Sequence, residues 1–257
     1  MTRHGQEALT GATPGVDGPA DPQWGALYRA GAMSAGLAVS CYVVALVVVA
    51  TTSTQPTSGG ARVLEYVDAH RTVYVLRQVL WTAPNLFLMV VFLGLAVALR
   101  QHSKSYAAIG GLIAISWWAV AFAWPTTGDG SLAMVVLSDK YSAADTTVAR
   151  APFVAGAEVL IALNDVPALI GVLQTLGILL ISVLMLRGTF SRGVAWLGAA
   201  TGAIGVISEI LRPVLGGAYA LYGVLLIVWM TWIGVALWRL GSASSRASTR
   251  RASSRGL

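Results

Sequence analysis

Charged residues are scarce in this sequence. Only 11% of its 257 residues are Asp, Glu, Lys or Arg, whereas an ordinary soluble domain carries about 25%. Hydrophobic residues make up 56% of the chain, and the mean hydropathy is +0.71. A folded chain with so few charged side chains would expose too much apolar surface to water. The composition therefore indicates an integral membrane protein.

Residues that bind metals or act as nucleophiles are also scarce or badly spaced. Cys41 is the single cysteine, which excludes an intrachain disulfide and a CxxC metal site. The three histidines, His4, His70 and His102, lie far apart and form no HExxH motif, and no GxSxG motif is present. We therefore expect no metal, no cofactor and no enzymatic activity.

Long apolar runs are what the sequence has instead. A helix needs roughly 20 apolar residues to cross the hydrocarbon core of a bilayer. Six runs meet this length, at about residues 30–50, 78–99, 106–124, 166–186, 193–215 and 218–238. They predict an all-α fold, in which residues 28–240 form one six-helix transmembrane bundle.

The two ends of the chain have a different composition. Residues 1–27 mix Gly, Pro and acidic residues without the apolar core of a signal peptide, and residues 241–257 are rich in Ser and Arg. Such compositions are typical of disordered segments. We therefore expect a disordered tail at each end.

The distribution of Lys and Arg predicts the orientation in the membrane. With six spans, the side that holds both termini carries eleven Lys and Arg residues, and the other side carries six. Loops rich in Lys and Arg stay in the cytoplasm. We therefore expect both termini to be cytoplasmic, with the protein in the bacterial inner membrane.

The two long loops on the outer side, 51–77 and 125–165, are expected to form an extracytoplasmic cap. In the first loop, apolar and long side chains recur at helical spacing, which predicts an interfacial helix running into the second span; they are Val63, Leu64, Val67, Arg71 and Tyr74. In the second loop, residues 151–163 form either a surface helix or an outward extension of the fourth span.

Three stretches carry a resemblance to a known family. They are "LSDKYSAADTTVARAPFVAGAEVLIAL" (137–163), "LMLRGTFSRGVAWLGAATGAIGVI" (184–207) and "WMTWIGVALWRL" (229–240). With the six spans, they resemble a family of bacterial six-helix membrane proteins classified as a domain of unknown function. The resemblance implies the six-helix architecture over roughly residues 28–240, and it implies no catalytic residue, cofactor or substrate.

Two charges interrupt the fifth span, in "SEILRP". Glu209 and Arg212 are three positions apart, so they lie on one face of a helix and can form an ion pair. By its position along the span, Glu209 lies in the outer third of the membrane. The pair is either a structural contact at the end of a helix or part of a polar cavity open to the outside.

Other polar residues are expected at the same depth and on the same side. Together they form a candidate outer polar cluster of Glu209, Arg212, Glu158, Asn164, Asp165 and Arg77. A cluster with charges of both signs suits a small zwitterion, an anionic headgroup or a proton. Deeper in the membrane, Gly198 and Gly202 form a GxxxG step that favours close helix packing, and Asn85 can hydrogen-bond between helices.

These observations favour a non-enzymatic membrane protein whose outer cap binds a partner, a lipid or a small ligand. The alternative is a small transporter that uses the outer polar cluster, and an intramembrane enzyme is a third class for which no motif is found. The expected partners are membrane lipids, a second copy of the chain or other membrane proteins. No nucleic-acid partner is expected.

Overall fold

The computed structural model describes residues 22–124, 126–127, 130–165, 169–188, 190–212, 214 and 216–255. Over these residues the protein is all-α apart from one short hairpin. It contains six helical segments that are long and apolar enough to cross a membrane. The predicted fold class, a six-helix polytopic membrane protein, is therefore confirmed. Most of the predicted N-terminal tail, residues 1–21, lies outside the described residues.

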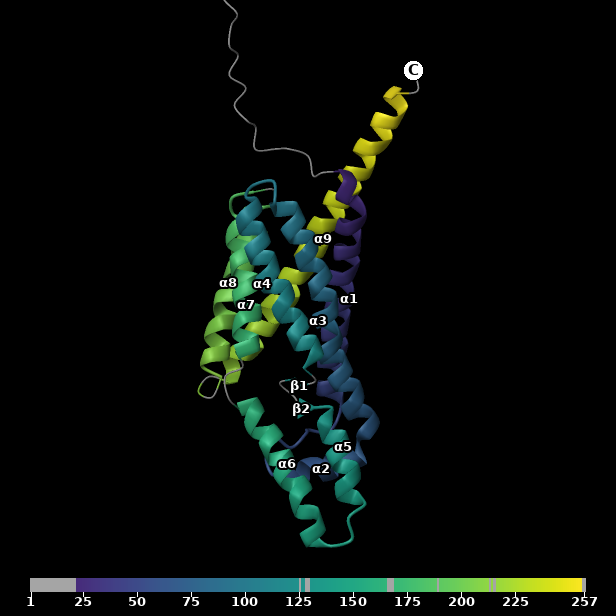
Figure 1. The fold of residues 1–257 in the computed structure, drawn as a ribbon, viewed down its shortest axis with the longest axis vertical. Coiled ribbons are helices and arrows are strands. Elements are labelled where there is room, and N and C mark those ends of the chain that lie inside the picture. Colours follow the sequence, from purple (N-terminus) through teal and green to yellow (C-terminus); the bar gives the residue numbers. More distant parts are fainter. Residues whose placement is uncertain are drawn as a thin grey trace, which may run out of the picture.

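Six helices form the bundle, preceded by a short 3-10 turn at Pro22–Trp24. They are α1 (Gly25–Thr51), α3 (Arg71–Leu99), α4 (Lys104–Ala123), α7 (Leu169–Met185), α8 (Arg192–Ile210) and α9 (Gly216–Arg255). Each packs against the next in chain order, and α9 returns to pack against α1. The six helices thus form a closed ring, with the first and last helices side by side (Figure 1).

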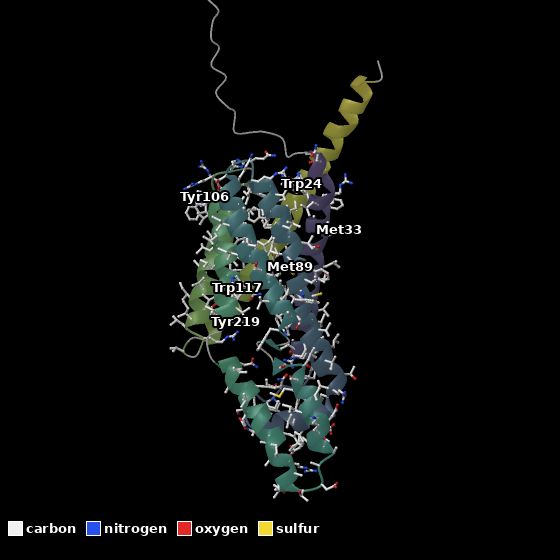
Figure 2. All side chains as sticks on the ribbon, in the orientation of Figure 1. Trp24, Met33, Met89, Tyr106, Trp117 and Tyr219 are labelled. Atoms are coloured by element: carbon white, nitrogen blue, oxygen red, sulfur yellow. The ribbon has the colours of Figure 1, made fainter. Side chains whose placement is uncertain are left out.

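Large apolar side chains fill the centre of the ring. Trp229 of α9 lies against Phe92 of α3, with 6.1 Å between ring centroids, and both are fully buried. The outer faces of the helices are apolar as well, as at Met33 and Leu37 of α1. An apolar outer face is what contact with lipid requires. Aromatic residues mark both ends of the bundle, with Trp24 and Tyr106 at one end and Tyr219 near the other (Figure 2).

The remaining elements form the cap, at the end of the bundle away from the C-terminus (Figure 1). They are α2 (Gly60–Ala69), the strands β1 (Thr126–Thr127) and β2 (Gly130–Ser131), α5 (Ala133–Ser142) and α6 (Thr147–Asp165). The helices α2, α5 and α6 all contact one another. They enclose a second, smaller hydrophobic core built around Leu64, Val67 and Met134.

Polar contacts reinforce the cap. The Tyr74 hydroxyl donates to the carbonyl oxygen of Ser131 at 2.9 Å and accepts from its backbone N–H at 3.1 Å. The Ser138 hydroxyl donates to the carbonyl oxygen of Leu64 at 2.7 Å. The Tyr141 hydroxyl donates to the Glu65 carboxylate at 3.0 Å, and this hydrogen bond raises the pKa of Tyr141. Long-range contacts of this kind join α3 to the hairpin and α2 to α5.

The first outer loop differs from its predicted form. Its helix, α2, ends at Ala69, and Arg71 and Tyr74 belong to α3. The apolar face of α2 packs against α5 and α6 inside the cap instead of lying on the membrane surface. The sequence shows the amphipathic face, but it does not show which surface covers that face.

Residues 151–163 of the second outer loop lie in a helix of the cap. They belong to α6, and the fourth candidate span, Thr147–Met185, covers both α6 and α7. Its 39 residues would measure about 58 Å as a helix, roughly twice the hydrocarbon thickness. Only part of this segment can therefore cross the membrane, and its α6 part packs against α2 and α5 in the cap.

The predicted disordered tail at 241–257 is not what the structure shows, because α9 continues as a helix to Arg255. The segment after Gly241 lacks proline, and its Ala and Arg residues have high helix propensity. The Ser-rich composition of this segment therefore does not mark the residue at which α9 ends. The extension projects beyond the bundle at the end opposite the cap (Figure 1).

Candidate functional site

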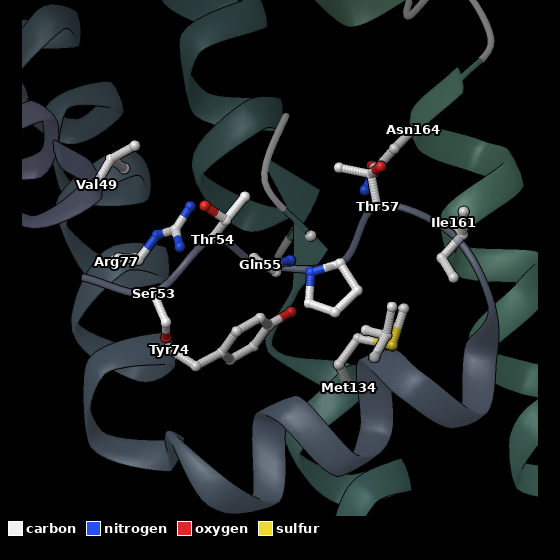
Figure 3. Close-up of a pocket in the computed structure, with 13 residues that line it drawn as sticks. Val49, Ser53, Thr54, Gln55, Thr57, Tyr74, Arg77, Met134, Ile161 and Asn164 are labelled. Atoms are coloured by element: carbon white, nitrogen blue, oxygen red, sulfur yellow. The ribbon is translucent and has the colours of Figure 1, made fainter.

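A cavity of about 330 Å³ lies between the cap and the bundle. Its walls come from the end of α1, the loop that connects α1 to α2, the start of α3, the hairpin, and the helices α2, α5 and α6 (Figure 3). Ligand pockets in proteins start at about this volume. The cavity is therefore large enough for a small molecule, and it lies where the membrane-spanning helices meet the cap.

The walls of the cavity are of two kinds. Apolar side chains come mainly from Val49, Met134 and Ile161, and neutral polar side chains come from the connecting loop and from Asn164. Arg77 is the one charged residue among the described lining residues, and only 5% of its surface is exposed. The cavity thus offers both an apolar wall and a set of hydrogen-bonding groups.

Beside the cavity, Arg212 holds three parts of the structure together. Its guanidinium lies 3.6 Å from the Glu209 carboxylate and donates to the carbonyl oxygen of Asn164 at 3.3 Å. It also lies over the ring of Tyr219, 4.8 Å from the ring centroid. These contacts join the end of α8, the start of α9 and the end of α6.

Glu209 faces the neighbouring helix α7 and not the lipid. Its side chain is buried, and a Cβ atom on Gly171 would lie 2.5 Å from its Cδ atom. A larger residue at position 171 would require the Glu209 carboxylate to shift. The Oε2 atom of Glu209 has no hydrogen-bond partner in the part of the chain that the structure describes. The ion pair expected from the i, i+3 spacing is present.

The candidate outer polar cluster is divided by the structure. Asn164 links two of its parts, because its carbonyl oxygen contacts Arg212 while the residue also lines the cavity, as Arg77 does. Glu158 lies apart, where its carboxylate accepts a hydrogen bond from the backbone N–H of Gly60 at 2.5 Å and caps the start of α2. The side chain of Asp165 lies outside the described residues.

The residues proposed for helix packing lie in the bundle. A Cβ atom on Gly202 would lie 2.6 Å from the backbone nitrogen of Leu179, so α8 and α7 approach closely at this point. Gly198 faces Ser182 and Trp229 at similarly short distances. Asn85 is half-buried in α3, next to Pro84. The glycine step thus lies at the contact between α7 and α8.

Sequence reasoning missed several residues of the cavity. The connecting loop contributes Ser53, Thr54, Gln55 and Thr57, and α3 contributes Tyr74. One signal was available, because Tyr74 and Arg77 are three residues apart and share a helix face. The loop gave no such signal, since its polar composition is also typical of an exposed connection.

No family model, no curated protein and no solved structure matches this chain. The six candidate membrane-spanning helices agree with the architecture that the family resemblance implies.

Proposed function

We propose that this multi-pass membrane protein is a non-enzymatic binding protein of the bacterial inner membrane, with its cap on the extracytoplasmic side. The cavity between the cap and the bundle carries the proposal. It combines a volume of about 330 Å³ with walls from seven segments of the chain. Such convergence of loops and helix ends is typical of ligand sites.

The charge distribution supports this orientation. The end of the bundle opposite the cap contains Arg100, Lys104, Arg187 and Arg192 in or beside two short loops. Short loops with such residues stay in the cytoplasm. The cap and its cavity then face the outside of the membrane, where they meet extracytoplasmic ligands and outer-leaflet lipids.

A binding measurement with a cavity-filling variant tests this function. The protein in lipid nanodiscs is screened by thermal shift against a panel of small polar and amphiphilic molecules. Thr57→Trp places a large ring in the cavity from the exposed loop, and Ser58→Trp adds the same ring at the next position, which does not line the cavity. We expect ligand-induced stabilisation in the wild type and in Ser58→Trp, and its loss in Thr57→Trp. Equal responses in both variants would place binding elsewhere.

A small transporter is a second candidate, favoured by one observation. Asn164 connects the cavity to Arg212 and, through it, to the buried Glu209 of the bundle. This gives a continuous polar route from the cavity into the outer third of the membrane. Uptake into proteoliposomes of a ligand found with the panel would favour transport over binding alone, if Glu209→Gln abolishes the uptake and retains the binding.

A further inference from the structure

We infer that the cavity accepts an amphiphile with an uncharged, hydroxyl-rich head, which neutral side chains of the loop and of α6 hydrogen-bond while the apolar wall holds its chain. This inference rests on the proposed function and names the class of ligand. It combines three features of the cavity: unoccupied neutral hydrogen-bonding groups, an apolar wall, and a position at the membrane boundary.

Three neutral side chains supply the hydrogen-bonding groups of the cavity. Thr54 and Thr57 on the loop and Asn164 on α6 line the cavity (Figure 3). Within the described residues, neither threonine hydroxyl nor the Asn164 side-chain amide has a hydrogen-bond partner. The hydrogen bond from Arg212 uses the backbone carbonyl oxygen of Asn164 and not its side chain. These groups are therefore available to a ligand.

The chemistry of these groups selects the head of the ligand. A hydroxyl both donates and accepts, and an amide offers two donors and an acceptor. Such groups match the hydroxyls of a polyol or sugar, each of which also donates and accepts. An Arg side chain has five N–H donors, so Arg77 can add a hydrogen bond to a hydroxyl while keeping contacts of its own. Hydroxyls thus suit this wall without requiring a free charge.

The apolar wall selects the rest of the ligand. Val49, Met134 and Ile161 line the cavity together with the polar groups. Val49 is also 38% exposed, and it continues an outward-facing apolar surface of α1 that includes Leu46 and Val47. The lipid-facing surface of the bundle therefore reaches the wall of the cavity. A hydrocarbon chain that enters from the membrane boundary can stay in apolar surroundings along this path.

Three amphiphiles with eight-carbon chains test this inference, because one has an uncharged sugar head, one an anionic head and one a cationic head. Octyl glucoside, octanoate and octylammonium are titrated below their micellar concentrations into nanodisc-embedded protein, and binding is measured by calorimetry. We expect octyl glucoside to bind most tightly. If free glucose and a sugar-headed lipid in the nanodisc compete equally with octyl glucoside, the sugar head alone accounts for binding. If only the lipid competes, the hydrocarbon chain also contributes to binding.

Variants locate the binding. Thr57→Val and Asn164→Leu each remove hydrogen-bonding capacity and leave the backbone carbonyl of Asn164 in place for Arg212. We expect each to raise the Kd for octyl glucoside by roughly three- to tenfold and to leave the other probes unchanged. Thr72→Val, an exposed position on α3 that does not line the cavity, is the control and should bind as the wild type does.

The outcomes separate this inference from the proposed function. Tighter binding of octanoate or octylammonium, sensitive to Thr57→Trp, would overturn the hydroxyl-rich head and leave the binding cavity standing. Octyl glucoside binding that is insensitive to Thr57→Val and Asn164→Leu would overturn the assignment of the contacts. Failure of all three probes, together with failure of the wider ligand panel, would overturn both.

Discussion

The bundle and the cap are both made of packed helices, but different forces hold their helices together. In the bundle, α7 and α8 approach closely through glycines, and many side chains on the outer faces are apolar. In the cap, α2 is amphipathic, and its apolar face is buried against α5 and α6. The solvent explains the difference. Lipid gives helices no hydrophobic reason to associate, whereas water does.

Polar contacts differ in the same way. Hydroxyls within the bundle bond mostly to the carbonyls of their own helix, as Thr201 does to Leu197 and Thr175 to Gly171. Several cap hydroxyls instead bond across elements, as Ser138 does to Leu64. The comparison predicts that apolar truncation will damage the cap, and that added volume at the glycine contacts will damage the bundle.

The largest expected effect comes from Leu64→Ala in the cap. Leu64 is fully buried, so its truncation removes apolar contacts and leaves a cavity. We expect a loss of about 2–5 kcal/mol of cap stability. Hydrogen–deuterium exchange in nanodiscs should show faster exchange in α2 and α5. Leu163→Ala on α6, where the side chain is 49% exposed, is the matched control. If exchange in the bundle helices became equally faster, the conclusion that the cap and the bundle have separate cores would be wrong.

A smaller effect is expected from Gly202→Ala in the bundle. The added Cβ would lie 2.6 Å from a backbone nitrogen of α7, which cannot move as a flexible side chain can. We expect a loss of about 1–3 kcal/mol, measured as a lower SDS fraction at the unfolding midpoint in mixed micelles. Gly223→Ala is the control, since its Cβ would meet nothing within 4 Å. The same loss in both variants would mean that glycine packing is not the cause.

The smallest effect is expected from Tyr74→Phe, which tests the connection between the two regions. The substitution removes a hydroxyl with two hydrogen bonds to Ser131 and keeps the ring. We expect a loss of about 1 kcal/mol, seen as faster amide exchange at the hairpin with little change elsewhere. Tyr106→Phe, at a site 63% exposed, should have no effect. No change at the hairpin in Tyr74→Phe would show that these hydrogen bonds do not secure the cap.

The sequence predicted the bundle better than the cap, for a physical reason. A membrane span needs a long apolar run, and that requirement is local and visible in the composition. The Glu209–Arg212 pair was also predictable, because both residues lie on one turn of one helix. In contrast, the α2 face, the Glu158 contact with Gly60 and the Arg212 contact with Asn164 join segments far apart in the sequence. Their partners depend on the arrangement of helices, which residue spacing does not encode.

The proposed ligand site requires the cap to lie on the extracytoplasmic side of the membrane, and cysteine labelling in intact cells tests this directly. Cys41 is first replaced by Ser, and then a single cysteine is placed at Thr146, between α5 and α6, or at Gln101, between α3 and α4. A membrane-impermeant maleimide should label Thr146→Cys in intact cells and Gln101→Cys only after permeabilisation. The reverse pattern would place the cap in the cytoplasm and contradict an extracytoplasmic ligand site.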